Sequence, residues 1–357
     1  MATRFYPLTV KEIVKTTPDC ALISFAVKDE WKDEFQYQQG QYLTLKATIE
    51  GEEVRRSYSL CSAPFDDIWR VGVKHVPGGK FSTFANETLK VGDTLEVMPP
   101  NGRFFVKTDA ERQKNYAAFA AGSGITPVFS IIKTHLNAEP KSTFKLFYVN
   151  QTVGSIILKE ELEGLKNQFM DRLEIFHFLT KQERDVAFFN GRLNEEKLDI
   201  IFKSIIEKSA LDDCFICGPE EMIFMIRDYL MGVGLDKKQI HFELFGTKGT
   251  AQKSDSATVQ KADGKMCEVT ILEGGKSFNF SLAQGADNIL DAALKKSADL
   301  PFACKGGVCC TCRAKLVEGQ VDMTANYALE QDELDAGYVL TCQSIPKSEK
   351  VVVDFDA

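Results

Sequence analysis

The sequence has little of several features that define common classes of protein. It contains no run of about 18 apolar residues, the length that a membrane-spanning helix needs. Its first residues, Met1–Val10, lack the apolar core and the small-residue cleavage site of a signal peptide. We therefore expect a cytoplasmic protein that has no membrane partner.

Positive charge and histidine are also scarce. Lysine and arginine number 43 against 51 acidic residues, which gives a net charge of −8. Because phosphate backbones are bound by basic patches, this balance argues against a nucleic-acid partner. The four histidines show no metal-ligand spacing; they are His75, His135, His177 and His241.

Cysteine, by contrast, is frequent and clustered. Five of the ten cysteines fall between Cys304 and Cys342, and in a reducing compartment such a cluster favours metal ligation over disulfides. Four residues separate Cys304 from Cys309, two separate Cys309 from Cys312, and Cys342 lies thirty positions further on. This C-x4-C-x2-C…C spacing is that of a plant-type [2Fe–2S] cluster. It predicts a cluster bound by these four cysteines.

The loop between the first two of these cysteines suits a cluster. Gly306 and Gly307 let the backbone curl close to inorganic sulfide and donate amide hydrogen bonds to sulfur. Cys310 as a ligand would break both spacings, so we predict that it does not bind iron. The alternative is a zinc site, although zinc sites usually combine two C-x-x-C-like pairs and only one is clean here.

The order of the expected elements suggests more than one domain, as does the length of 357 residues. Roughly the first hundred residues carry short strands and glycine turns, the pattern of an antiparallel barrel or sandwich. From Lys107, strands alternate with helices, which predicts a parallel sheet wound in the βαβ manner. Expected strands are Tyr42–Ala47, Tyr58–Cys61, Trp69–Lys74, Tyr116–Ala121, Phe144–Val149, Leu173–Leu179 and Asp213–Cys217, and expected helices are Ile125–Leu136, Ile157–Gln168, Asn194–Lys208 and Glu220–Met231.

A polar stretch separates this part from the cysteine cluster. Residues 248–265 have no apolar period and are predicted to be an interdomain linker. Beyond it, a hairpin (268–272 and 277–282) and a helix (Asn288–Lys296) precede the cysteines. Cys267–Ala357 holds 8 basic and 14 acidic residues, so most of the negative charge lies there. The predicted domains are therefore 1–106, 107–247 and 266–357.

Two segments of the first domain suit a flavin. An arginine can neutralise a pyrophosphate, a tyrosine can pack on the ring system, and a serine can bond its edge near N5. A glycine turn before a helix offers free amides to phosphate. Each segment alone is more typical of an ordinary hairpin, and only the two together indicate a flavin site. The residues are Arg56, Ser57, Tyr58 and Ser59 in the first segment, and Gly79, Lys80, Phe81 and Ser82 in the second.

A third segment suits a dinucleotide. Gly122, Gly124, Thr126 and Pro127 form a G-x-G-x-x-P pattern between a strand and a helix. Proline is accepted in the first helical turn, and the helix N-terminus can receive a phosphate. The pattern has proline in place of the last glycine of the G-x-G-x-x-G fingerprint, so a plain strand–helix turn is the alternative.

Two later strand ends point to the same ligand. Cys217, Gly218 and Pro219 follow a strand whose carboxyl end would face the ligand crevice of an open α/β sheet. Thr180 and Lys181 follow another strand and can hold a 2′-phosphate, which would favour NADPH over NADH. A solvated loop lysine is the alternative for Lys181.

The end of the second domain carries two further candidates. Glu243 can serve a proton relay, and Phe245 can cover the flavin, although packing in the core is an equal alternative for the phenylalanine. Together with Ser59 and Cys217, Glu243 is our candidate for the reacting centre.

Taken in order, these motifs resemble the ferredoxin–NADP reductase superfamily, in the branch with a fused C-terminal plant-type ferredoxin. Reductase components of multicomponent oxygenases form this branch. The segments 149–162 and 185–193 are most similar to reductase subunits of the phenylacetyl-CoA epoxidase type. Gln151 stands where close relatives tend to have arginine, which leaves NADH open beside NADPH.

The resemblance implies an FAD-binding antiparallel β-barrel, an α/β parallel-sheet nucleotide-binding domain and a β-grasp-like α+β [2Fe–2S] domain. It implies that the R-x-Y-S residues contact FAD and that the C-G-P loop lies near the nicotinamide. Since a hydride carries two electrons and the cluster accepts one, the flavin would divide the pair. The partner would be a terminal oxygenase that docks on the acidic ferredoxin domain. The alternatives are the reductase of another mono- or dioxygenase, and an electron-transfer module without nicotinamide turnover.

Overall fold

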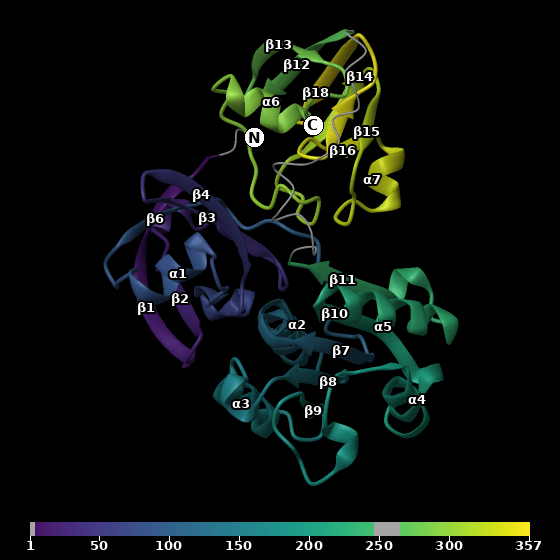
Figure 1. The fold of residues 1–357 in the computed structure, drawn as a ribbon. Helices are drawn as coiled ribbons and strands as arrows, with labels where there is room; N and C mark the ends of the chain where they lie inside the picture. Colours follow the sequence, from purple (N-terminus) through teal and green to yellow (C-terminus); the bar gives the residue numbers. More distant parts are fainter. Residues whose placement is uncertain (1–3, 246–264) are drawn as a thin grey trace. The chain divides into compact units, whose positions relative to one another are not determined.

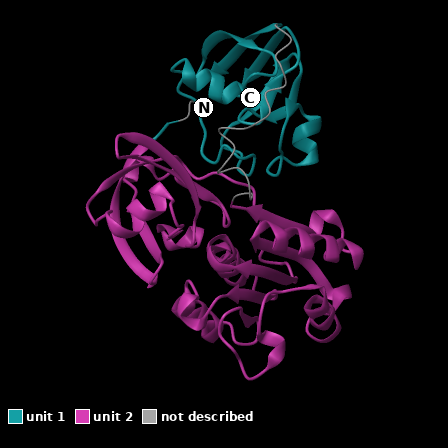
Figure 2. Cartoon of the chain, viewed as in Figure 1, with its two compact units in different colours: residues 1–5, 246–357 teal, residues 6–245 magenta. Residues whose placement is uncertain are grey.

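The computed structural model describes residues 4–245 and 265–357 (Figure 1). The chain divides into two compact units, residues 6–245 and residues 246–357 together with residues 1–5 (Figure 2). The predicted linker, 248–265, lies outside the described residues apart from Lys265. No helix in the described part of the chain is long and apolar enough to cross a membrane.

The first part of the larger unit is an antiparallel barrel. Its strands follow the order β4-β3-β6-β1-β2-β5. A bridge between Leu60 and Val71 joins the end of β4 to β5, which closes the sheet on itself. The strands are β1 (Tyr6–Thr17), β2 (Cys20–Ala26), β3 (Tyr42–Ile49), β4 (Glu52–Ser59), β5 (Trp69–Lys74) and β6 (Thr94–Val97).

One strand of this barrel differs from the sequence-based expectation. The expected strand Tyr58–Cys61 is in fact the end of β4, which begins at Glu52 and stops at Ser59. Its charged start, Glu-Glu-Val-Arg-Arg, gives no apolar run, because β4 forms a hairpin with β3 and turns several side chains to water.

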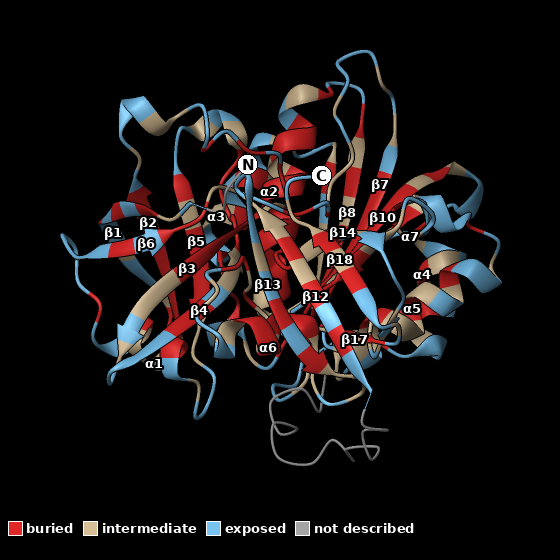
Figure 3. Cartoon of the chain, turned by 90° about the horizontal axis from the view of Figure 1, so that it is seen from above, coloured by how far each residue is buried: buried red, intermediate tan, exposed pale blue. Residues whose placement is uncertain are grey.

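The second part of the larger unit is a five-stranded parallel sheet, as predicted. The strand order is β11-β10-β7-β8-β9, and the inner strands are buried along most of their length (Figure 3). Near-continuous apolar strands are expected where helices cover both faces of a sheet. The strands are β7 (Asn115–Ala121), β8 (Thr143–Asn150), β9 (Leu173–Leu179), β10 (Leu211–Gly218) and β11 (Ile240–Leu244), and the helices are α2 (Ile125–Ala138), α3 (Lys159–Gln168), α4 (Glu195–Ser204) and α5 (Glu220–Gly232).

Helix α2 is buried on nearly every side. Its outward residues contact the barrel: Ser130 Oγ donates to the Ser62 carbonyl at 2.6 Å, and Lys133 Nζ lies 2.7 Å from both carboxylate oxygens of Asp66. A helix that is apolar all round is one that is enclosed, and the sequence of α2 fits that rule. A few residues of the barrel part, such as Cys20, Leu22 and Cys61, therefore pack with α2 in the core of the parallel-sheet part, while the barrel also encloses a core of its own.

Two helices are shorter than the sequence suggested. Helix α3 begins at Lys159 rather than Ile157 because Leu158 adopts a left-handed conformation, with φ of 58°. Helix α4 ends at Ser204 rather than Lys208, and the chain then turns so that Ile206 is buried.

The C-terminal unit is a mixed sheet with the order β13-β12-β18-β14-β16, and β12 pairs with β18 in parallel. Helix α6 (Ile289–Lys295) packs its buried Ile289 and Leu290 into the same core. The predicted hairpin is present, and this arrangement has the α+β character that we expected. The strands are β12 (Met266–Glu273), β13 (Lys276–Ala283), β14 (Arg313–Glu318), β15 (Val321–Met323), β16 (Tyr338–Leu340), β17 (Ser344–Pro346) and β18 (Lys350–Asp354), with a short helix α7 (Gln331–Asp335).

Candidate functional site

The strand order of the parallel sheet creates a crevice between β7 and β10. The connection from β7 leads to β8 on one side, whereas β10 lies on the other, so the order reverses between them. Ligands of open α/β sheets bind at the carboxyl ends of the strands at such a point. The segments that follow these two ends are Gly122–Gly124 and Gly218-Pro219, both of which the sequence had indicated.

These two segments press closely together. A Cβ atom on Gly124 would lie 2.1 Å from the carbonyl oxygen of Cys217, and one on Gly218 would lie 3.1 Å from the Cβ of Ala121. Only glycine allows this approach at Gly124. The two glycines therefore allow the ends of β7 and β10 to approach each other closely. The sequence pattern alone did not reveal this approach.

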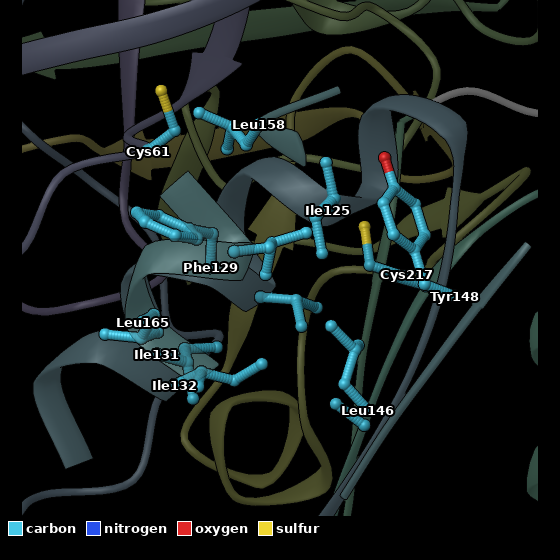
Figure 4. Close-up of a cluster of buried hydrophobic side chains, with 14 of the residues drawn as sticks. Cys61, Ile125, Phe129, Ile131, Ile132, Leu146, Tyr148, Leu158, Leu165 and Cys217 are labelled. Carbon is cyan, nitrogen blue, oxygen red and sulfur yellow. The ribbon is translucent and has the colours of Figure 1, made fainter. Parts of the chain in front are cut away.

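Cys217 contributes its backbone to the crevice rather than a reactive thiol. Its side chain is fully buried beside Tyr148 and Ile125 (Figure 4). Burial raises the pKa of the Cys217 thiol well above its usual value, and the nearby Glu243 carboxyl adds to this. The thiol is thus neutral, and it packs in the core.

The remaining residues of the G-x-G-x-x-P segment are mostly enclosed. Thr126 and Pro127 are buried, and a Cβ on Gly72 of the barrel would lie 2.7 Å from the Thr126 methyl group. Gly122 stays partly accessible, and the Tyr148 hydroxyl donates to its carbonyl at 3.0 Å. Gly122 is therefore accessible to a nucleotide, whereas the Thr126 side chain packs against the barrel.

Ser59 and Glu243 meet although 184 residues separate them. The Ser59 hydroxyl at the end of β4 donates to Glu243 Oε2 on β11 at 3.1 Å. Glu243 is also the register partner of Cys217 on β10. Burial raises the pKa of the Glu243 carboxyl to about 8, and the hydrogen bond from Ser59 works against that rise. The three residues predicted for the reacting centre therefore lie together: Glu243 contacts Ser59 and is the strand neighbour of Cys217.

The flavin-type segment of β4 alternates between the two faces of the strand. Arg56 is exposed, with its guanidinium donating to the Arg55 carbonyl at 2.7 Å. Tyr58 packs on Phe81 with ring centroids 5.6 Å apart, and burial raises its pKa. Ser57 Oγ lies 3.1 Å from Thr44 Oγ1, so its hydroxyl already has a partner.

The second flavin-type segment opens helix α1 (Lys80–Glu87), with Gly79 as its N-cap. Ser82 Oγ accepts from the Val76 amide at 3.1 Å and donates to the Gly79 carbonyl at 3.1 Å, which braces the turn. Lys80 is paired with Glu52. The backbone amides of the first helical turn have no acceptor within the helix and suit a phosphate.

Thr180 and Lys181 run beside the end of β8. Their amides donate to the carbonyls of Asn150 and Gln151 at 2.9 and 2.8 Å, and the Lys181 side chain is exposed. The residues that follow line a cavity of about 420 Å³ to which His177 contributes. Burial lowers the pKa of His177 to about 4, so its ring is neutral.

Phe245 directly follows β11 and has 45% of its surface exposed. It is therefore not a core residue among the described parts of the chain, which leaves the predicted flavin-covering role open.

The four predicted ligand cysteines form two pairs. Cys309 Sγ lies 3.1 Å from Cys304 Sγ, and the neighbouring Cys312 side chain is the main cause that lowers the pKa of the Cys342 thiol. Among the described residues, no three His, Cys, Asp or Glu side chains converge as a single metal ion requires. A two-and-two arrangement suits two irons that each take two thiolates, and it does not suit one tetrahedral zinc ion.

The loop around these pairs is arranged as expected. The Gly306 amide donates to Cys304 Sγ at 3.3 Å. A hydrogen bond from Cys309 is the main cause that lowers the pKa of the Cys304 thiol, assisted by loop amides. Cys310 Sγ donates to the Ala328 carbonyl at 3.3 Å.

Three residues near the candidate sites were not predicted from the sequence. Tyr148 holds the Gly122 carbonyl, Lys74 Nζ of the barrel lies 3.9 Å from the Cβ position of Gly122, and Gln343 contacts Cys342 Sγ at 3.5 Å. The position of Gln343 directly after the fourth cysteine was the one signal in the sequence, since the other two depend on strands packing together.

Comparisons with known families agree with this architecture. Residues 7–106 match the model of an oxidoreductase FAD-binding domain, residues 119–228 that of an oxidoreductase NAD-binding domain, and residues 271–347 that of a 2Fe-2S iron-sulfur cluster binding domain. These matches define an NAD(P)H-dependent oxidoreductase with flavin- and cluster-binding domains, and they confirm the predicted fold class and cofactors.

Relatives that align over nearly the whole chain identify the family within this class of oxidoreductases. The chain is 44% identical to a subunit of the 1,2-phenylacetyl-CoA epoxidase of Escherichia coli (strain K12), over 99% of both chains. It is 32% identical to the ferredoxin reductase component of 3-ketosteroid-9-alpha-monooxygenase of Rhodococcus rhodochrous, over 98% of this chain and 96% of the relative. The fold also matches phthalate dioxygenase reductase, with a TM-score of 0.61, 22% identity and 98% of both chains covered. The chain belongs to the family of three-domain oxygenase reductases.

We predict that Gly124→Ala lowers the free energy of unfolding by about 1–3 kcal/mol, because the added methyl group would overlap the Cys217 carbonyl. It should also weaken NADPH binding. Urea unfolding and a nucleotide titration measure both effects. Gly164→Ala is the matched control: its Cβ position in α3 is open, so the change should add about 0.5–1 kcal/mol. Equal effects of the two substitutions would contradict the assignment.

We predict that Glu243→Gln flattens the pH dependence of stability. Because the folded-state pKa is raised to about 8, the neutral carboxyl stabilises the fold at low pH, and this contribution is lost as the pH rises through 8. The wild-type free energy of unfolding should fall on the order of 4 kcal/mol more than that of the variant between about pH 5 and pH 9. Urea unfolding at several pH values tests this, with exposed Glu160→Gln as control; parallel curves would refute it.

Proposed function

We propose that this protein passes electrons from NADPH through FAD and a [2Fe–2S] cluster to the oxygenase component of a phenylacetyl-CoA epoxidase. The observation that carries the proposal is the 44% identity with a component of that enzyme from Escherichia coli over 99% of both chains. When bound, the flavin supplies the conversion of a two-electron hydride donor into single-electron steps. The residues of this chain would hold and orient the flavin, the nucleotide and the cluster.

In the barrel, the R-S-Y-S segment would hold FAD. Arg56 has an exposed guanidinium suited to the pyrophosphate, and Tyr58 offers a ring already braced by Phe81. The amides at the start of α1, with Gly79 as N-cap, suit the phosphates. Ser82 would support this turn through its two backbone hydrogen bonds.

At the reacting centre, Ser59 and Glu243 would orient the flavin edge and hold a proton. The Glu243 carboxyl is protonated at neutral pH because its pKa is raised to about 8. It can therefore donate as well as accept a hydrogen bond, and the Ser59 hydroxyl lies 3.1 Å away to complete a relay. Cys217 and Gly218 would shape the nicotinamide pocket through their backbone.

For the nucleotide, the crevice between β7 and β10 would receive the nicotinamide half, with Gly122 and Pro219 at its rim. Thr180 and exposed Lys181 would bind a 2′-phosphate, and this favours NADPH. Gln151 beside them is uncharged, so NADH stays a second candidate donor.

In the C-terminal unit, Cys304 and Cys309 would bind one iron and Cys312 and Cys342 the other, following the observed pairs. The excess of acidic residues in Cys267–Ala357, 14 against 8 basic, favours docking on a basic surface of the oxygenase.

A second candidate is the reductase of a different oxygenase. The 32% identity with the 3-ketosteroid-9-alpha-monooxygenase component over 98% of this chain supports it. The residues of the site serve both candidates equally, because the oxygenase selects the organic substrate.

The proposed function is tested with purified oxygenase components. With NADPH as donor, the protein should support turnover by the phenylacetyl-CoA epoxidase oxygenase component, faster than with NADH and more slowly at high salt, because salt screens the docking charges. The oxygenase component of 3-ketosteroid-9-alpha-monooxygenase is the control. Support of the control alone would favour the second candidate, and support of neither would refute both.

The ligand set is tested with a cysteine series. Cys309→Ser should remove the visible absorption of the cluster and most of its iron, since a thiolate ligand is lost. Cys310→Ser should retain both, because its sulfur bonds the Ala328 carbonyl. Flavin reduction by NADPH, measured by rapid mixing, should stay normal in both variants. A cluster lost from Cys310→Ser and kept in Cys309→Ser would contradict the assignment.

A further inference from the structure

Gln343 occupies the position directly after the fourth cysteine, between β16 and β17. Its side chain makes three hydrogen bonds. Nε2 donates to the Lys305 carbonyl at 2.9 Å and to Cys342 Sγ at 3.5 Å, and Oε1 accepts from Thr324 Oγ1 at 2.7 Å. One glutamine thus contacts three separate segments around the cysteines.

The bond to Lys305 connects the two parts of the ligand set. Lys305 follows Cys304 directly, whereas Gln343 follows Cys342, so the side chain joins the three-cysteine loop to the segment of the fourth cysteine. The loop is shaped to receive it: Gly307 has φ of +73°, and a Cβ there would lie 3.2 Å from Gln343 Cγ. A larger residue at position 307 would displace the glutamine.

The glutamine is itself held from the other side. Besides the bond from its hydroxyl, Thr324 donates its backbone amide to the Gln343 carbonyl at 3.0 Å. Because Thr324 fixes Oε1, the amide nitrogen must face the sulfur and the Lys305 carbonyl. The orientation of the amide therefore follows from the hydrogen-bond network.

A hydrogen bond to a ligand sulfur has a known effect on a cluster. Reduction adds negative charge to the cluster and its thiolates, and a donor aimed at a sulfur stabilises that charge. Loss of such a donor makes reduction less favourable and lowers the potential.

We propose that Gln343 is a positioning residue that raises the reduction potential of the cluster, through its hydrogen bond to Cys342 Sγ, and aligns the fourth cysteine with the loop of the other three. The inference rests on the ligand set in the proposed function. It adds a residue that is not itself one of the four proposed iron ligands.

The test is a potentiometric titration of the full-length protein loaded with FAD and cluster, followed by the electron paramagnetic resonance signal of the reduced cluster. Gln343→Leu keeps the size of the side chain and removes its donor. Gln331→Leu is the matched control, because the Gln331 amide bonds Asp335 within the exposed helix α7 and not a cysteine. We expect a lower midpoint potential and altered signal positions in Gln343→Leu alone, with an unchanged flavin potential.

A second readout is the fraction of cluster reduced at equilibrium by a fixed excess of NADPH, which should fall several-fold in Gln343→Leu while the rate of flavin reduction stays normal. A cluster potential equal to that of the wild type would overturn the proposal. If Gln343→Leu does not retain the cluster, Thr324→Val provides the test. It keeps the glutamine but frees its Oε1, so the potential should fall by a smaller amount, and an unchanged potential would again overturn the proposal.

Failure of the ligand set is recognised separately. Cys342→Ser should lose the cluster whatever Gln343 does. A Cys342→Ser protein that retains its full iron content would refute the ligand assignment itself, whereas loss of the cluster there with an unchanged potential in Gln343→Leu would refute only the role of the glutamine.

Discussion

The hydrogen bond between Ser59 and Glu243 is the contact on which the proposed reacting centre depends. It joins the end of β4 in the barrel to β11 in the parallel sheet, so each half presents its strand ends to the same place. The bond persists because the halves share a core around α2, whose residues are enclosed by barrel and sheet. Any shift of barrel against sheet would break the bond and leave a buried carboxyl without its donor, at a cost of about 1–3 kcal/mol.

Close packing at the start of α2 depends on two glycines. Gly72 of β5 accepts the Thr126 methyl group, and Gly124 accepts the Cys217 carbonyl. Two close approaches thus fix the start of α2 from opposite sides. A nucleotide bound at this crevice and a flavin bound on the barrel would meet at positions that the polypeptide sets before either binds.

Much of the fold and part of the candidate site were predictable from the sequence, for identifiable reasons. Cysteine spacing predicts a ligand set because two irons and four thiolates allow few arrangements, and alternating strands and helices allow little besides a parallel sheet. Strand β9 was predicted with its observed bounds, since an apolar run stands between polar turns. The sequence analysis assigned Ser59 and Glu243 to one centre, but their direct hydrogen bond was not predictable, because 184 residues separate them. Nor was the packing role of Thr126, which depends on a glycine in a distant strand.

The cysteine loop likewise combines features that the sequence predicted with features that it did not. Its spacing predicted the ligands and the non-ligand Cys310, and the Gly306 amide donates to sulfur as expected. The Gln343 network was missed because it depends on Thr324 and Lys305, which approach only when β15 and β17 pair. Local sequence therefore predicts the ligands of the cluster, whereas the groups that surround the cysteines depend on tertiary pairing.

The central claim is that electrons enter at the Ser59–Glu243 centre and leave through the cysteine-bound cluster. Anaerobic rapid mixing of the loaded protein with NADPH, followed at flavin and cluster wavelengths, tests it most directly. We expect that flavin absorption falls first and cluster absorption follows, and that Ser59→Ala slows the first phase while Cys309→Ser removes only the second. Cluster reduction that precedes flavin reduction, or that is unaffected by Ser59→Ala, would contradict it.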